Sequence, residues 1–482
     1  MNTASTWISR SVSRLRVSAS SDAKSADGAP AKAEVPRTTT ERLAATLRRG
    51  NEVLSPRVLR RLLAELQAVA APQVSELEGG RLAQGVLDWY ATASPEERRD
   101  LWLLMCEQFT PDAARIRTAR QRYEAAAGTD EEGQAEIGLR RALVSPRTRL
   151  LQRFAVPAGG MRFLVDLRAD LLPHLKGDKR LLPLDAELEH LFSTWFDIAF
   201  LELRRLSWDS PASLIEKLIK YEAVHDIRSW ADLKNRLDSD RRCYGFFHPS
   251  LPNEPLIFVE VALVDKVSES ITPLLDESAA PADLSRATTA IFYSISNTQT
   301  GLRGVSFGNS LIKHVVETLK DEFPRLRTFA TLSPIPGFRA WLSKHGGKAI
   351  EQLPDKLRAE LGRAVGFEPP QAQHLVAAVE KAQELDAKSP IRQALMRAAA
   401  HYLGRELQEG KPLDPVARFH LGNGARVERL NWAGDPSHKG AKQSFGLMVN
   451  YLYDLKRIDK HRSQLAQGMV PVSGDIDALL PD

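Results

Sequence analysis

The stretch with the clearest chemistry is residues 296–313, where a predicted strand passes through a glycine-containing loop into an amphipathic helix. Gly301, Gly304 and Gly308 allow the backbone to approach a ligand closely, and the start of the helix presents unpaired N–H groups to an anion. A pyrophosphate suits such a loop. A plain strand–loop–helix connection explains the same glycines equally well, so both interpretations stay open at this point.

The same loop contains a candidate nucleophile. Gly304-Val305-Ser306-Phe307-Gly308 matches the Gly-x-Ser-x-Gly elbow of hydrolases. That elbow places its serine on a sharp turn directly after a strand, whereas residues 297–303 separate this motif from the predicted strand. An ester or thioester hydrolase that uses Ser306 is therefore the weaker alternative.

The common sequence motifs of metal sites and nucleotide-binding loops are absent from the chain. The sequence has no H-x-H, H-E-x-x-H or C-x-x-C spacing and no Gly-x-x-x-x-Gly-Lys-Ser/Thr loop. Glu187-x-x-His190 and Glu222-x-x-His225 have the spacing of iron sites in helix bundles, but such sites also need glutamates from two further helices. Structural hydrogen bonds are the favoured interpretation of both pairs.

Two kinds of sequence follow one another along the chain. Residues 38–190 read as successive helices with apolar stripes, and Ser55-Pro56 and Ser94-Pro95 are helix starts with proline at the first helical position. Further helices are predicted over 111–127 and 161–172. This part has no catalytic constellation, which favours a scaffold or oligomerisation domain.

Residues 191–482 are predicted to form a mixed α/β domain with a helical insertion. Helical periodicity returns over 350–410, where Ser389-Pro390 opens a segment that Gly404 could cap. The fold class is therefore α+β, a helical domain followed by a mixed domain. The predicted strands are 255–263, 290–296, 327–332, 426–432 and 445–451, with a helix over 310–320.

Charge is concentrated at the N-terminus. The chain has 66 Lys+Arg and 61 Asp+Glu, a formal charge of +5, and residues 1–37 contribute +3 of it through six basic and three acidic residues. The other 445 residues carry only +2, so a nucleic-acid partner is not expected. Residues 1–37 are predicted to be a disordered or targeting tail, because the first 21 are rich in Ser and Arg and contain no acid.

Two cysteines, Cys106 and Cys243, exclude a disulfide framework and fit a reducing compartment. No apolar run approaches the roughly 18 residues of a membrane span. We therefore expect the protein to be located in the cytoplasm of a bacterium, or in the mitochondrial matrix if the tail is a presequence.

Several short strings resemble the malonyl-CoA decarboxylase family, in the family's order, between residues 159 and 455. Residues 303–312 also resemble the pyrophosphate loop of GNAT-type acyltransferases, although Ser306 stands where that pattern has its first glycine. The strings are Glu-Ala-Val-His at 222–225, Arg-Arg-Cys-Tyr at 241–244, Ala-Ile-Phe-Tyr-Ser-Ile-Ser at 290–296, Leu-Ser-Pro-Ile-Pro-Gly-Phe at 332–338, Phe-His-Leu-Gly-Asn-Gly at 419–424 and Gly-Leu-Met-Val-Asn-Tyr at 446–451.

The resemblance implies a GNAT-like catalytic domain behind a helical domain, and conversion of malonyl-CoA to acetyl-CoA and CO₂ without a metal or organic cofactor. Ser333 and His420 match the family's catalytic serine and histidine, and Tyr453 matches a tyrosine that lines the site. Some family members have glutamate at the position of Ser306, which leaves any carboxylate role there in doubt. A homotetramer is also implied. The matching CoA-binding residues are Arg303, Gly304, Val305, Ser306, Phe307, Gly308 and Asn309.

Loss of CO₂ from a malonyl thioester leaves an enolate, so the site needs neutral donors near the developing oxyanion and a source for one proton. We expect Ser333 to orient the carboxylate or relay a proton. We expect His420 to deliver the proton, because histidine ordinarily titrates in a useful range. Locally, Ser333 also suits a turn, His420 a structural role beside Asn423-Gly424, and Tyr453 a core position. A domain that binds acyl-CoA without catalysis is the alternative outside the enzyme class.

Overall fold

The computed structural model describes residues 53–305, 311–381 and 385–481. The chain divides into two compact units, Met1–Glu52 and Val53–Asp482, and every described residue belongs to the second. The predicted tail of residues 1–37 therefore lies outside the described residues. Since the second unit contains both helical and mixed regions, the domain boundary between residues 190 and 191 stays a prediction.

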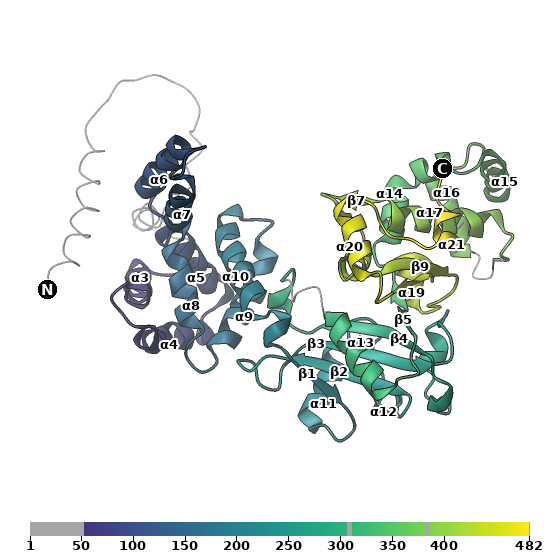
Figure 1. The fold of residues 1–482 in the computed structure, drawn as a ribbon, viewed down its shortest axis with the longest axis horizontal. Coiled ribbons are helices and arrows are strands. Elements are labelled where there is room, and N and C mark those ends of the chain that lie inside the picture. The colour runs from purple at the N-terminus through teal and green to yellow at the C-terminus, as the bar shows by residue number, and fades with distance from the viewer. Residues whose placement is uncertain (1–52, 306–310, 382–384, 482) are drawn as a thin grey trace. The chain divides into compact units, whose positions relative to one another are not determined.

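The described chain begins with a helical region, in which helices start at Pro56 and Pro95 as the sequence predicts (Figure 1). The Ser55 side chain accepts the N–H of Val58 at the start of α3, and Ser94 and Glu97 form a complete capping box on α5. The apolar face of α3 points inward, and leucines such as Leu62 are fully buried. The helices are α3 (Pro56–Ala70), α4 (Glu76–Thr92), α5 (Pro95–Gln108), α6 (Ala113–Ala126), α7 (Glu132–Leu143), α8 (Pro146–Phe154), α9 (Gly160–Leu171) and α10 (Leu182–Trp195).

A mixed sheet follows, in the order β1-β2-β3-β4-β5-β10, with β6 and β9 also paired to β10. Every pair is antiparallel except β4 with β5, which are parallel and joined through α13 (Leu311–Glu322). The strands are β1 (Glu202–Leu206), β2 (Arg241–Phe247), β3 (Pro255–Val264), β4 (Thr289–Asn297), β5 (Thr328–Thr331), β6 (Ser333–Pro334), β9 (Arg426–Asn431) and β10 (Met448–Leu452).

The last predicted strand is displaced along the chain. The apolar pattern predicts a strand over 445–451, but β10 begins at Met448. Phe445 has a φ of 56° and Gly446 a φ of 82°, so these two residues form the left-handed end of α19 (His438–Ser444) and cannot extend a strand.

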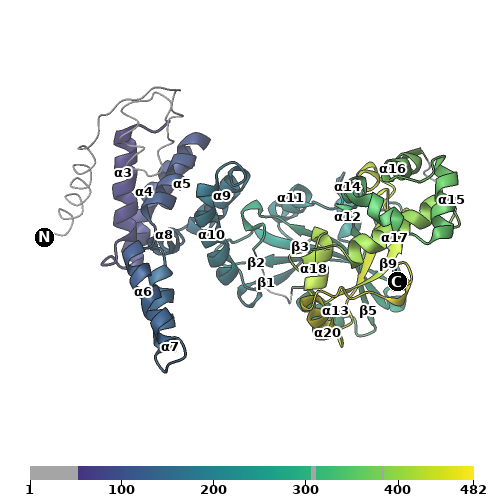
Figure 2. The same ribbon diagram turned by 90° about the horizontal axis from the view of Figure 1, so that it is seen from above.

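The sheet is buried on both faces, so helices must cover each of them. Glu260 and Val261 are neighbours in β3 and therefore point to opposite faces. The face of Glu260, which we call the α12 face, is covered by α11 (Ala212–Tyr221) and α12 (Trp230–Arg236). The opposite face, which we call the α18 face, lies toward α18 (Pro415–Gly422), and Figure 2 shows α11 and α12 on the other side of the strands.

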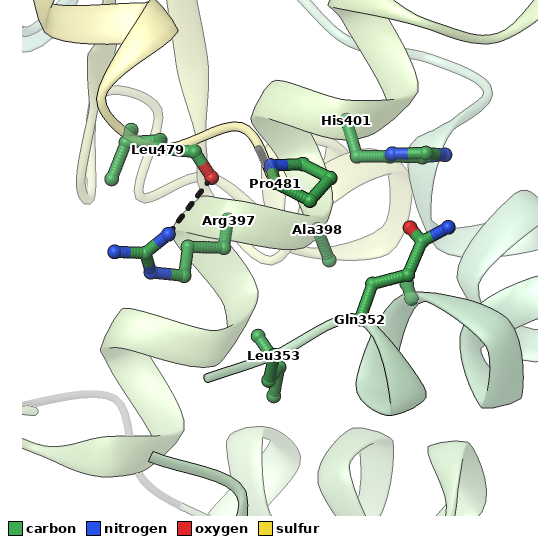
Figure 3. Close-up of a pocket in the computed structure, with 8 residues that line it drawn as sticks. Gln352, Leu353, Arg397, Ala398, His401, Leu479 and Pro481 are labelled. Carbon is green, nitrogen blue, oxygen red and sulfur yellow. Dashed lines mark hydrogen bonds between the residues drawn. The ribbon is translucent and has the colours of Figure 1, made fainter. Parts of the chain in front are cut away.

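The predicted helical insertion begins earlier than expected, directly after β6. Its helices are α14 (Phe338–Glu351), α15 (Asp355–Val365), α16 (Ala372–Lys381) and α17 (Pro390–Gly404). The C-terminal segment closes over α17, where Arg397 donates a hydrogen bond to the Leu479 carbonyl at 3.2 Å (Figure 3). The cavity between them is about 10 Å³, enough for about one water molecule. The predicted fold class is confirmed: a helical region precedes a mixed α/β region with a helical insertion.

Candidate active site

The candidate active site lies where β4 and β5 stop pairing. Their parallel register ends at Phe292–Thr331, and β4 continues to Asn297. The chain after β5 turns into β6, which pairs with β10 instead. In α/β sheets, ligands often bind where neighbouring parallel strands separate.

Ser333 is the first residue of β6, and its side chain is buried. Its hydroxyl donates a hydrogen bond to Thr331 Oγ1 at 2.8 Å, and its Oγ lies 3.2 Å from His420 Nε2. Thr331 Oγ1 also accepts the backbone N–H of Tyr451 at 3.1 Å. Backbone geometry between strands therefore positions the threonine oxygen, which in turn positions the serine hydroxyl.

His420 is buried in α18, a helix that the sequence analysis did not predict. Its imidazole stacks on the Tyr451 ring with centroids 4.7 Å apart. Burial lowers the pKa of His420 to about 3, so the ring is neutral at physiological pH and carries one N–H. The expectation of a histidine with an ordinary titration range is therefore wrong, because within the described part of the chain no charge offsets the loss of solvation.

Tyr453 follows β10 and lies against the same imidazole. Its Oη is 2.8 Å from His420 Nδ1, and its backbone N–H donates to the Phe329 carbonyl at 2.9 Å. Burial raises the pKa of Tyr453, so the phenol stays protonated. The structure thus brings together Ser333, His420 and Tyr453 in one hydrogen-bonded row, which we call the Ser–His–Tyr array.

Asp414 supports this array and was missed in the sequence. It caps α18 by accepting the backbone N–H groups of Val416 and Ala417 at 2.9 and 3.0 Å. Its Oδ2 lies 3.3 Å from Tyr402 Oη and 3.4 Å from the N–H of Gly337. Asp414 therefore joins the turn after β6 to the helix that carries His420.

Neither Asp414 nor Thr331 was predicted as a site residue, and the sequence contains a signal for only one of them. Asp414-Pro415 is a helix-start signal, an N-cap residue followed by proline at the first helical position. Thr331 gives no local signal, because its backbone partner Tyr451 is 120 residues away in sequence.

The predicted CoA-binding loop is described only in part. Arg303 follows the turn η6 (Thr300–Leu302), Gly304 has a φ of 82°, and Val305 is buried. This left-handed backbone explains the glycine at 304. The remaining loop residues, Ser306, Phe307, Gly308 and Asn309, lie outside the described residues, and with them the candidate hydrolase nucleophile.

The helical region holds the start of this loop. Arg168 of α9 donates to the carbonyls of Gly301 and Arg303 at 2.8 and 2.9 Å and pairs with Asp185 at 2.8 Å. A Cβ atom on Gly301 would lie 1.9 Å from the Val165 carbonyl oxygen. The lack of a side chain at Gly301 therefore allows α9 to pack closely against the loop. The prediction that Gly301 allows a ligand to approach is wrong.

A second buried polar cluster lies on the α12 face. Arg236 donates to Asp232 at 2.7 Å and to Glu260 at 3.1 Å, and all three side chains are buried. Burial beside Glu222 raises the pKa of Glu260 to about 8. Glu222 in turn accepts the Ser294 hydroxyl at 2.8 Å. We call these residues the α12-face cluster.

Neither predicted Glu-x-x-His pair forms a metal site. Glu187 is ion-paired with Arg147, and Glu222 accepts the backbone N–H of His225 at 2.7 Å. Among the described residues, no group of three or more His, Cys, Asp or Glu side chains could hold a metal ion. Within the same ranges, no helix combines the length and the apolar character needed to cross a bilayer.

Solved structures share this architecture. Malonyl-CoA decarboxylase from Rhodopseudomonas palustris is 41% identical with a TM-score of 0.75, and covers 87% of this chain and 99% of its own. The enzyme from Cupriavidus metallidurans is 44% identical with a TM-score of 0.72, and covers 88% of this chain and 100% of its own. The fold is therefore that of the malonyl-CoA decarboxylases, with a helical N-terminal region.

The sequence comparisons identify the family. The malonyl-CoA decarboxylase N-terminal domain matches residues 109–196, and the C-terminal domain matches residues 199–482. Mitochondrial malonyl-CoA decarboxylase of Anser anser anser is 39% identical over 350 residues, 67% of each chain. The Rattus norvegicus protein is 40% identical over 343 residues, 67% of this chain and 68% of its own. The chain belongs to the malonyl-CoA decarboxylase family and is an enzyme whose reaction is the decarboxylation of malonyl-CoA.

Proposed function

We propose that this enzyme decarboxylates malonyl-CoA with its own side chains and without a cofactor, and that the Ser–His–Tyr array carries the reaction. The observation that supports this most directly is the contact of Ser333 Oγ with His420 Nε2 at 3.2 Å, continued from Nδ1 to Tyr453 Oη at 2.8 Å. All three groups are uncharged and buried.

The first step is cleavage of the bond between the malonyl carboxylate and C2. The electron pair of that bond passes into the thioester carbonyl as CO₂ leaves, so negative charge moves from the carboxylate to the thioester oxygen. The Ser333 hydroxyl holds the carboxylate with one neutral hydrogen bond. A full ion pair would stabilise the reactant more than the transition state and would slow the step.

The second step is transfer of one proton to C2 of the enolate. His420 Nε2 can supply it directly or through Ser333, and Tyr453 Oη can replace it at Nδ1. A thioester enolate is much more basic than any of these groups, so the transfer is favourable although the imidazole is neutral. Solvent then restores the proton of Tyr453.

The substrate's CoA moiety is assigned to the loop of Arg303, Gly304, Val305, Ser306, Phe307, Gly308 and Asn309. Support comes from the left-handed Gly304 and from the anchoring of the loop backbone by Arg168. Backbone N–H groups at the start of a helix suit a pyrophosphate. The family membership of the chain argues against a non-catalytic acyl-CoA-binding module.

The decisive experiment incubates the purified enzyme with malonyl-CoA and a metal chelator. We expect acetyl-CoA and CO₂ in equal amounts. Folded protein without turnover would overturn the proposal. Free CoA and malonate as products would favour the hydrolase that uses Ser306, and labelling of that serine by serine-directed reagents would confirm it.

We also propose that the enzyme is a homotetramer in the bacterial cytoplasm, with the mitochondrial matrix as the alternative compartment. The helical region supports assembly, because α7 and the residue that follows it expose Ile137, Leu143 and Val144. Light scattering at working concentration should give four times the 53.6 kDa chain mass, and a monomeric mass contradicts it.

A further inference from the structure

We infer that Thr331 is a positioning residue that sets the direction of the hydrogen bonds in the Ser–His–Tyr array, so that His420 carries its one proton on Nε2. This inference rests on the proposed function of the array and adds to it a residue and a tautomer.

Thr331 is a fixed acceptor. It is fully buried at the end of β5, and its Oγ1 receives the Tyr451 backbone N–H at 3.1 Å and the Ser333 hydroxyl at 2.8 Å. A backbone N–H can only donate, and a hydroxyl oxygen has two acceptor sites. Both acceptor sites of the threonine oxygen are therefore in use.

The direction of the remaining bonds follows from the serine. Ser333 has one hydroxyl hydrogen, which it gives to Thr331, so the 3.2 Å contact with His420 needs the hydrogen on Nε2. A neutral imidazole has only one N–H, so Nδ1 must accept the hydroxyl hydrogen of Tyr453 at 2.8 Å. Burial keeps this pair neutral by lowering the pKa of His420 and raising that of Tyr453.

All bonds then point the same way, from Tyr453 through His420 and Ser333 to Thr331. His420 cannot act as a base toward Ser333 in this arrangement, so the serine is not prepared as a nucleophile. When a malonyl carboxylate arrives, the Ser333 hydroxyl can rotate toward it and give up only one neutral bond to Thr331. The His420 N–H remains available for the later proton transfer.

The kinetic test replaces Thr331 by valine, which keeps the shape of the side chain and removes the acceptor. The Ser333 hydrogen should then turn to His420 Nε2, and the imidazole should shift its proton to Nδ1. We expect kcat to fall at least about tenfold while KM for malonyl-CoA changes less than about twofold. Thr331→Ser keeps the acceptor and should restore kcat.

The matched control is Thr328→Val, at the other end of β5, where the side chain is half-buried. It should leave kcat unchanged. An unaltered kcat in Thr331→Val overturns the inference, provided that the wild type turns over malonyl-CoA. A wild type that fails to do so overturns the proposed function instead.

A spectroscopic test reads the tautomer of His420 in the wild-type enzyme itself. In ¹⁵N-histidine NMR of the wild type, the His420 signals are those lost in His420→Gln. We expect the pattern of a neutral ring protonated on Nε2, and a shift to the Nδ1–H pattern in Thr331→Val. An Nδ1–H pattern in the wild type overturns the inference.

Discussion

The two faces of the sheet bury polar side chains in opposite ways. On the α18 face, the Ser–His–Tyr array is made of uncharged groups, and burial keeps His420 neutral by lowering its pKa to about 3. On the α12 face, Arg236 stays charged between Asp232 and Glu260, at 2.7 and 3.1 Å. The difference separates a working arrangement from a structural one: protons can move along neutral hydrogen bonds, whereas a buried ion cluster is held in place by its charges.

The largest effect on stability is expected on the α12 face. Arg236→Met leaves Asp232 buried without its cation and removes the hydrogen-bond donor of Glu260, which should lower the free energy of unfolding by about 3–5 kcal/mol. The kcat of the folded fraction should stay near the wild-type value, because this cluster lies on the face away from His420. Urea unfolding and active-site-normalised kinetics measure both quantities.

A matched control is Arg120→Met, since Arg120 pairs with Glu124 at 2.7 Å on the exposed surface of α6. Its removal should leave stability unchanged within error. If Arg236→Met instead lowers kcat and leaves stability intact, the assignment of a structural role to the α12 face is wrong.

A smaller effect is expected at Asp414, which links the two catalytic elements of the α18 face. Asp414→Ala removes the cap of α18 and should lower the free energy of unfolding by about 1–2 kcal/mol. It should also lower kcat severalfold, because α18 positions His420 against Ser333. Asp112→Ala removes the exposed cap of α6 and should leave kcat unchanged. Equal kcat in both variants argues against a positioning role for Asp414.

The last expected effect is a change in acid sensitivity, which should be seen only below about pH 6.5. The pKa of His420 is about 3 in the folded protein and near 6.5 when unfolded, so the unfolded state binds the extra proton between these values. The stabilisation from the neutral ring is complete above pH 6.5 and is lost as the pH falls toward 3. In His420→Gln, the free energy of unfolding should therefore fall less steeply with decreasing pH over this range. The difference in slope should correspond to one bound proton. Urea titrations at several pH values test this, and parallel curves for both proteins count against a buried neutral imidazole.

Much of the fold could be predicted from local pattern. The apolar runs that became β3 and β4 are buried along nearly their whole length, and Ser55 and Ser94 cap helices as expected. The strand β1 was missed because it is an edge strand of sequence Glu-Leu-Arg-Arg-Leu, with most side chains exposed and no apolar alternation.

The site was less accessible from the sequence. Ser333 and His420 were singled out by family resemblance, while their local surroundings suited a turn and a structural histidine. Their contact depends on β6 pairing with β10 and on the link between Gly337 and Asp414, and both join residues that are distant in sequence. The neutral state of His420 is a property of burial, which no local pattern reports.

The most direct test of the account compares binding and turnover in one variant. His420→Gln should bind malonyl-CoA with a Kd within about threefold of the wild type by calorimetry, because CoA is held elsewhere, while acetyl-CoA formation falls at least about a hundredfold. Ser333→Ala should behave in the same way. Wild-type acetyl-CoA formation by either folded variant would contradict the assignment of the reaction to the Ser–His–Tyr array.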